Sequence, residues 1–155
     1  MKTIMVQMSD KQWTMEAMHF ASALARNIDG KIVLLRLVLA TNPGLLGWGV
    51  PLPSVEEQRQ LQECATVAED YGVEFCVQPM HYISSTEATA QAVELFKVDV
   101  LFANIPRSSI PLWHKFRLWN MKRQLGNCRL YTLTEEQPLH IKEPIPAGMR
   151  NIETA

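Results

Sequence analysis

Polar side chains that could hold an anion follow two apolar runs of the sequence, at 3–8 and 98–103. They carry hydroxyl, carboxylate, amide and guanidinium groups, and they are Ser9, Asp10, Asn104, Arg107, Ser108 and Ser109. A guanidinium beside hydroxyls can bind phosphate or carboxylate through charge-assisted hydrogen bonds. The same residues also fit a structural role, because a short side-chain oxygen just before a helix accepts an unbonded backbone N–H. From the residues alone, an anion site and a set of helix caps beside a solvated arginine both stay open.

The residue types typical of catalysis or metal binding are scattered along the chain. They are His19, His81, His114, His140, Cys64, Cys76 and Cys128. No two of them stand at a spacing typical of zinc, and no histidine accompanies a nucleophile. The three cysteines are interpreted as reduced thiols of the core. The sequence therefore predicts neither an enzyme nor a metal site.

Apolar periodicity predicts five strands that alternate with four helices. The strands are expected at 3–8, 31–39, 73–79, 98–103 and 130–133, and the helices at 11–27, 54–72, 84–96 and 111–125. This alternation predicts an α/β fold with a doubly wound parallel sheet, and so a Rossmann-like, three-layer architecture. Ligands of such sheets bind beyond the carboxyl ends of the strands where the winding reverses. For this chain that place is near 8–10 and 104–109.

The predicted helices carry start and stop signals. The expected starts are Ser9 or Asp10, Ser54 followed by Glu57, and Ser84 followed by Glu87, and the expected stops are Gly30 and Gly72. A serine followed three residues later by glutamate is a capping box, in which the two residues satisfy each other's free N–H groups. Apolar faces are expected to include Ile28 in the first helix, Leu95 in the third and Trp119 in the fourth.

Two segments carry aromatic or apolar residues without a clear internal role. They supply the candidate contacts to a partner or membrane, which are Leu45, Leu46, Trp48, Trp113, Lys115, Trp119, Lys122 and Arg123. The first segment, 41–53, is rich in glycine and proline, and the second is a basic helix in a stretch without acidic residues from 100 to 134. A flap packed on its own domain and an amphipathic core helix with a wet basic face explain the same residues. Contact with anionic lipid or an acidic partner is the less favoured alternative.

The chain of 155 residues, with 47% hydrophobic and 20% charged residues and a net charge of −1, is expected to form one domain. Residues 1–134 are assigned to this domain and 135–155 to an extended tail with several prolines. The balanced charge and the absence of a recognised binding motif give no support for nucleic acid as a partner. No stretch has the roughly 20 apolar residues of a membrane span, so the sequence predicts a cytoplasmic protein, or the cytoplasmic part of a larger one.

The order of elements and three local stretches resemble the universal stress protein family, of the adenine nucleotide alpha-hydrolase-like fold. KTIMVQMSDKQWTMEAMHFASALA resembles the family's opening strand, acidic turn and first helix. VDVLFAN resembles its fourth strand, and GNCRLYTL resembles the segment that leads into the last strand. The resemblance implies the strand order 3-2-1-4-5 and a homodimer joined through the last strand.

The sequence departs from the pattern of the nucleotide-binding members. Their aspartate at the end of the first strand corresponds to Ser9, with Asp10 one position later. Their Gly-x-x-Gly, nine residues and Gly-Ser or Gly-Thr correspond to positions held by Asn104, Arg107, Arg117 and Leu118. Side chains at the glycine positions block the approach of backbone N–H groups to phosphates. No cofactor is therefore expected, and ATP or AMP is the less favoured alternative.

The function predicted from the sequence is that of a stress-response regulatory domain that works through dimer and protein contacts. Two alternatives remain. One is a sensor of nucleotides or other anions at the ends of the first and fourth strands. The other is a regulatory module of a membrane transporter, in contact through the apolar 44–50 loop and the basic tryptophan-bearing helix.

Overall fold

The computed structural model describes residues 1–39, 52–82, 84–104 and 119–133. Its strands are β1 (Lys2–Gln7), β2 (Gly30–Leu39), β3 (Glu74–Tyr82), β4 (Val100–Phe102) and β5 (Arg129–Tyr131). Its helices are α1 (Lys11–Ile28), α2 (Val55–Tyr71) and α3 (Ser85–Leu95), and residues 119–125 are also helical. The five strands form one parallel sheet in the order β3-β2-β1-β4-β5, so the predicted fold and strand order are confirmed.

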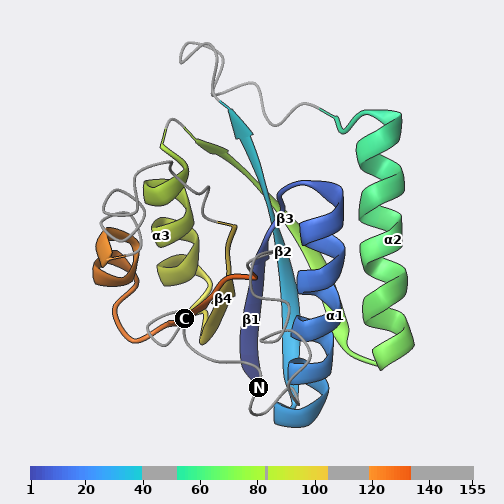
Figure 1. Cartoon of the computed structure of the whole chain (residues 1–155), viewed down its shortest axis with the longest axis horizontal. Helices are drawn as coiled ribbons and strands as arrows, with labels where there is room; N and C mark the ends of the chain where they lie inside the picture. Colours follow the sequence, from blue (N-terminus) through green and yellow to red (C-terminus); the bar gives the residue numbers. More distant parts are fainter. Residues whose placement is uncertain (40–51, 83, 105–118, 134–155) are drawn as a thin grey trace.

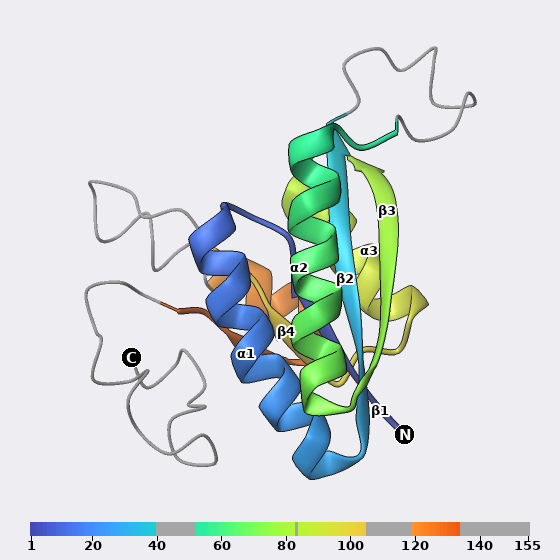
Figure 2. The ribbon, with the colours of Figure 1, turned by 90° about the vertical axis from the view of Figure 1, so that its right-hand side faces the viewer.

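Helices cover both faces of this sheet. Figure 1 shows α1 and α2 on one side, with α3 and the helical residues 119–125 on the other. Seen after a quarter turn, α1 and α2 lie side by side along the sheet (Figure 2). Because successive side chains of a strand point to opposite faces, the central strands contribute side chains to two separate hydrophobic cores, one on each face of the sheet. Ile4, Val6, Ile32 and Leu34 pack on the α1 and α2 side, whereas Met5, Val33, Leu35 and Leu101 pack on the α3 side.

The helix ends agree with the predicted signals in part. Asp10 and Ser54 accept the backbone N–H of Trp13 and Glu57, respectively, and α2 ends at Gly72 with φ +70°. Two details of the prediction are wrong. The stop of α1 is Asp29, which adopts the left-handed conformation at φ 54°, so Gly30 is already the first residue of β2.

Ser84 is the second case, because it starts α3 without any side-chain bond to the helix. Its backbone is extended, with φ −112° and ψ 122°. A capping box needs the serine oxygen to reach the N–H of the third helical residue, and this bond is absent at Ser84. The sequence therefore predicted the correct N-cap residue, Ser84, but the predicted hydrogen bond from the helix to its side chain is absent.

The buried faces of the helices are narrower than predicted. α3 buries only small or β-branched residues, namely Ala88, Thr89, Ala92 and Val93, and Leu95 is 68% exposed. Ile28, in the last turn of α1, is also exposed. Trp119 is 56% exposed, because the buried residues in the described part of its helix, 119–125, are Met121 and Leu125. Two residues correspond to about 200° of rotation, so Trp119 and Met121 point to opposite sides.

Strand lengths differ from the predicted ones at the sheet's ends. β3 continues to Tyr82, three residues beyond the expected end at Pro79, and β4 is reduced to three residues. β3 is an edge strand, at the opposite side of the sheet from β5. An edge strand tolerates proline because the missing N–H removes no hydrogen bond to a neighbouring strand.

Candidate functional site

The carboxyl ends of β1 and β4 meet, and the structure joins three of the predicted site residues there. The side-chain amide of Asn104 donates to Ser9 Oγ at 2.9 Å and to Asp10 Oδ2 at 3.3 Å. Asn104 stands 95 positions after Ser9, so only the parallel pairing of the two strands brings these groups together. We call Ser9, Asp10 and Asn104 the strand-end triad.

The first turn of α1 holds the triad in place. Asp10 Oδ1 accepts the backbone N–H of Trp13 at 3.0 Å, and Ser9 N donates to Thr14 Oγ1 at 2.9 Å. Of the two predicted helix caps, Asp10 therefore takes this role and Ser9 does not. Thr14 is fully buried and was missed in the sequence, although a hydroxyl residue inside an otherwise apolar helix face is a usable signal.

Both carboxylate oxygens of Asp10 are thus engaged within the protein. A carboxylate offers about four acceptor positions, so Asp10, which is exposed, keeps acceptor capacity toward solvent. The triad can accept a hydrogen bond from an approaching hydroxyl or amine. It is less suited to an anion, because the group that faces solvent is a carboxylate.

A second polar contact lies at the end of β1, next to α3. Gln7 Nε2 donates to Thr89 Oγ1 at 3.3 Å, and Thr89 Oγ1 donates to the carbonyl of Ser85 at 2.7 Å. Thr89 is fully buried. Neither residue was singled out in the sequence, because each lies in a segment that already had a complete structural explanation. The contact fixes α3 against the carboxyl end of the central strand.

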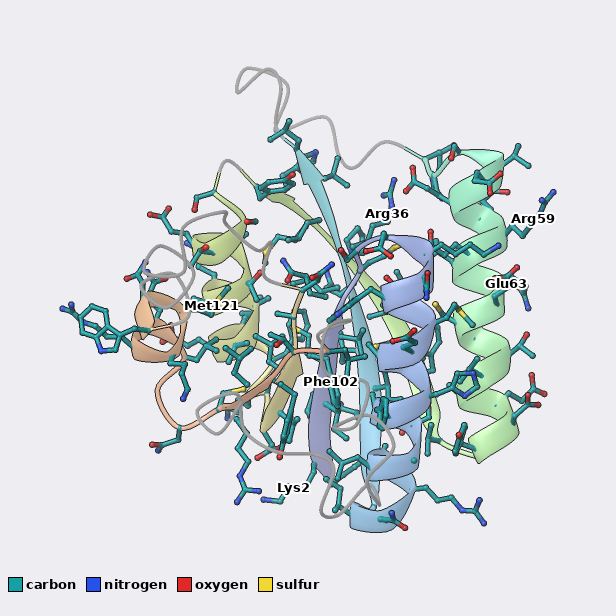
Figure 3. All side chains as sticks on the ribbon, in the orientation of Figure 1. Lys2, Arg36, Arg59, Glu63, Phe102 and Met121 are labelled. Atoms are coloured by element: carbon teal, nitrogen blue, oxygen red, sulfur yellow. The ribbon has the colours of Figure 1, made fainter. Side chains whose placement is uncertain are left out.

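The carboxyl half of β2 contributes a buried charge. Arg36 is 8% exposed, and its Nε lies 2.9 Å from Oε2 of Glu57 in the first turn of α2. Figure 3 shows Arg36 near the ends of the helices at the carboxyl edge of the sheet, while Lys2 lies at the opposite edge. After Lys31, Arg36 is the one charged residue in the apolar run at 31–39. The sequence therefore marked Arg36 as unusual but did not indicate that Glu57 is its partner.

Several predicted site residues lie outside the described residues. They are Arg107, Ser108 and Ser109 of the candidate anion site, and Leu45, Leu46, Trp48, Trp113 and Lys115 of the candidate contact surface. Trp119, Lys122 and Arg123 of that surface are described. The guanidinium carbon of Arg123 lies 5.6 Å from the centre of the Trp119 ring, a cation–π arrangement on an exposed part of the helix.

The cysteines differ from one another more than predicted. All three are free thiols, but only Cys64 is buried, whereas Cys76 is exposed and Cys128 is half-buried. The interpretation of all three as core thiols is therefore wrong for Cys76, whose side chain stands on the edge strand β3. Burial raises the pKa of Cys64 to about 11, and the Glu63 carboxylate acts in the same direction. Burial likewise raises the pKa of Cys128 to about 12, with a smaller effect of Asp99.

Across the described part of the chain, no three His, Cys, Asp or Glu side chains gather as a metal site. In the same residues, no helix has the length and apolar character needed to cross a membrane. In the described residues, the polar contacts that we identify at the carboxyl ends of the strands are therefore the strand-end triad, the bond between Gln7 and Thr89, and the ion pair between Arg36 and Glu57.

Comparison with known proteins defines the class of fold. No protein-family model and no curated protein matches the sequence. Among solved structures, a universal stress protein in complex with cAMP aligns with a TM-score of 0.60 over 86% of this chain and 96% of its own, at 14% identity.

Two further structures give the same result. The universal stress protein from Archaeoglobus fulgidus in complex with dAMP aligns with a TM-score of 0.53 over 86% of this chain and 98% of its own, at 12% identity. A universal stress protein family protein from Arabidopsis thaliana with AMP bound aligns with a TM-score of 0.53 over 88% of this chain and 95% of its own, at 15% identity. The chain has the fold of the universal stress proteins, and the predicted resemblance is confirmed at the level of the fold.

Proposed function

We propose that this protein is a cytoplasmic regulatory domain of the universal stress protein type, which acts through protein contacts and without catalysis. We assign residues 1–134 to this domain and 135–155 to the tail predicted from the sequence. The domain does not bind ATP in the way that the glycine-containing members do. It transmits a signal by presenting surfaces to a second copy and to other proteins.

The observation that carries this proposal is the strand-end triad. Asn104 bonds to both Ser9 and Asp10 where a ligand of this fold class would lie. A nucleotide that used Asp10 in this position would have to compete with the amide of Asn104. Asparagine at this position also brings a side chain where a backbone N–H would need close access to a phosphate.

A ligand titration tests the proposal. We expect the melting temperature of the purified protein to stay unchanged with ATP, ADP, AMP, cAMP and cyclic dinucleotides, with and without magnesium. A ligand present at 100 times its Kd stabilises a native protein by about 2.7 kcal/mol, which thermal shift resolves easily. The Arabidopsis thaliana protein with AMP bound serves as the positive control. A reproducible shift with any of these compounds would overturn the proposal.

The proposed homodimer forms through the last strand of the sheet. Its support is the position of β5 at one end of the strand order, where it pairs with β4. Sedimentation equilibrium at micromolar concentration should give twice the mass of the chain. A monomer under these conditions would exclude the dimer while leaving the titration result unaffected.

A nucleotide or anion sensor is the second candidate. Its support is that structures with the same fold are complexes with cAMP, dAMP and AMP, and that the exposed Asp10 keeps acceptor capacity for a hydroxyl or amine of such a ligand. A sensor would gain thermal stability from one of the nucleotides. That gain should be lost in Arg107→Ala and kept in Arg26→Ala, which changes an arginine in the last turn of α1.

Regulation of a membrane transporter is the third candidate, and the exposed pair Trp119 and Arg123 favours it. An aromatic ring beside a cation suits the boundary of an anionic membrane or an acidic protein. Vesicles that contain anionic lipid should then bind the protein at low salt and release it at high salt. The variant with Lys115, Lys122 and Arg123 changed to Glu should not bind, whereas Arg59→Glu on α2 should bind normally. Absence of binding at low salt excludes lipid contact.

A further inference from the structure

The strand β3 forms one end of the sheet, and in the described residues it pairs only with β2. It is nine residues long and therefore presents a long row of backbone groups on its outer side. Such an edge is a template for pairing with a strand of another molecule unless local features prevent it. Two residues of β3, Gln78 and Pro79, change the hydrogen-bonding groups on this outer side.

The register identifies which backbone groups of β3 face outward. Met8 N donates to the carbonyl of Leu35 at 2.9 Å, so the backbone of Leu35 faces β1 and that of Arg36 faces β3. Arg36 stands opposite Pro79 in the parallel pairing. A residue in a parallel ladder bonds to the two neighbours of its opposite residue, which here are Gln78 and Met80. The N–H and C=O positions of Phe75, Val77, Pro79 and His81 therefore face outward.

The outward position of Pro79 lacks a donor, and its acceptor already takes one hydrogen bond. Proline has no backbone N–H. Its carbonyl accepts a hydrogen bond from the side-chain amide of the preceding residue, Gln78 Nε2, at 3.1 Å. The missing donor and the acceptor that Gln78 already uses lie at the same point of the edge, between the outward groups of Val77 and His81. A strand that added here would leave its own acceptor unbonded at that point, which costs about 1–3 kcal/mol for a buried group. Its donor would have to share the Pro79 carbonyl with the Gln78 amide or displace that amide.

We propose that Gln78 and Pro79 close the β3 edge, so that the sheet of a second copy of this chain cannot continue from it. The inference does not depend on the proposed function. Its consequence is directional: any pairing that extends the sheet is confined to the opposite end, where β5 lies. A one-sided sheet permits a closed pair of subunits and prevents open-ended stacking of sheets.

Amide hydrogen exchange on the wild-type protein is the first test. The amides of Cys76, Gln78 and Met80, which face β2, should be protected. The outward amides of Phe75, Val77 and His81 should exchange at least about tenfold faster, at rates that do not change between low micromolar and millimolar protein. Protection of the outward amides that grows with concentration would overturn the proposal.

A double variant is the second test. Gln78→Val with Pro79→Val restores the donor and frees the acceptor, and both new residues favour strands. We expect its weight-average mass to rise with concentration beyond the wild-type value, together with protection of the outward amides. Met80→Val, in the same strand but facing β2, is the matched control and should keep the wild-type mass. A folded double variant with the wild-type mass at every concentration would overturn the proposal, and if the variant does not fold, the exchange test on the wild type decides.

Discussion

The guanidinium Nε of Arg36 lies 2.9 Å from Oε2 of Glu57, and this ion pair joins the carboxyl half of β2 to the first turn of α2. The Arg36 side chain is 10% exposed and that of Glu57 is 41% exposed. The ion pair therefore joins a buried guanidinium to a carboxylate that is partly exposed to solvent. Removing one partner of such a pair usually costs more than the net value of the pair, because the remaining charge loses its compensation.

Glu57→Gln tests this contact with almost no change in side-chain volume. We expect the free energy of unfolding to fall by about 1–2 kcal/mol, since the partial exposure of Glu57 reduces the effect. Glu56→Gln is the matched control, because both glutamates lie in the first turn of α2 and share the same helix dipole. Urea denaturation that gives equal losses for the two variants would show that the ion pair contributes nothing.

The bond between Asn104 and Ser9 should appear as a coupling energy. We expect Asn104→Ala and Ser9→Ala together to cost less than the sum of the single variants by about 0.5–1 kcal/mol. The physical reason is that either variant alone already removes the 2.9 Å bond. A second cycle with Asn104→Ala and Ser54→Ala should be additive, because Ser54 bonds at the start of α2 instead. Additivity in the first cycle would argue against the triad in solution.

The two serine caps should differ in their contribution to stability. Ser54→Ala removes the bond to Glu57 N at 3.2 Å and should cost about 1 kcal/mol. Ser84→Ala should cost less than about 0.5 kcal/mol, because Ser84 makes no side-chain bond to α3. Chemical denaturation of both variants provides the comparison. A loss at Ser84 as large as that at Ser54 would contradict the observed caps.

The cysteines should react in a defined order. Cys76 is exposed and should be alkylated first by iodoacetamide at pH 8, as followed by peptide mass spectrometry. Burial holds the pKa of Cys64 at about 11, so about one thiol in a thousand is ionised at that pH. In urea, Cys64 should react as fast as Cys76. Equal rates in the native protein would contradict the burial of Cys64.

The raised pKa of Cys64 also predicts a dependence of stability on pH. Well below pH 9.0, the ordinary thiol value, Cys64 is protonated in both the folded and the unfolded states. As the pH rises from 9.0 toward about 11, the unfolded state loses the proton and the folded state keeps it. The unfolded state then binds fewer protons, so the free energy of unfolding falls with rising pH. Cys64→Ala should show a shallower fall, and an unchanged slope would contradict the assignment.

How much of this protein could be predicted from its sequence differs between the fold and the candidate site. Apolar runs such as 31–39, and helix stops such as Gly72, depend on neighbours a few residues away. They were sufficient to predict the order in which strands and helices follow one another along the chain. Single positions that were wrong, such as Gly30, Ser84 and Trp119, depend on backbone angles or on the rotation of a helix against the sheet. Those quantities follow from packing and are only weakly encoded in local sequence.

By itself, the sequence determined the alternating α/β architecture, the likeness to universal stress proteins and the side chains at the glycine positions. Only the tertiary structure decided that Asn104 bonds to Ser9 and Asp10, that Arg36 pairs with Glu57, and that Gln78 covers the carbonyl of Pro79 at an outer edge. The first two contacts join residues from different strands and helices, and the outward direction of Pro79 follows from the register of β2 and β3. Periodicity reports which residues are buried. It does not report which polar groups meet, because that depends on the pairing of strands distant in the chain.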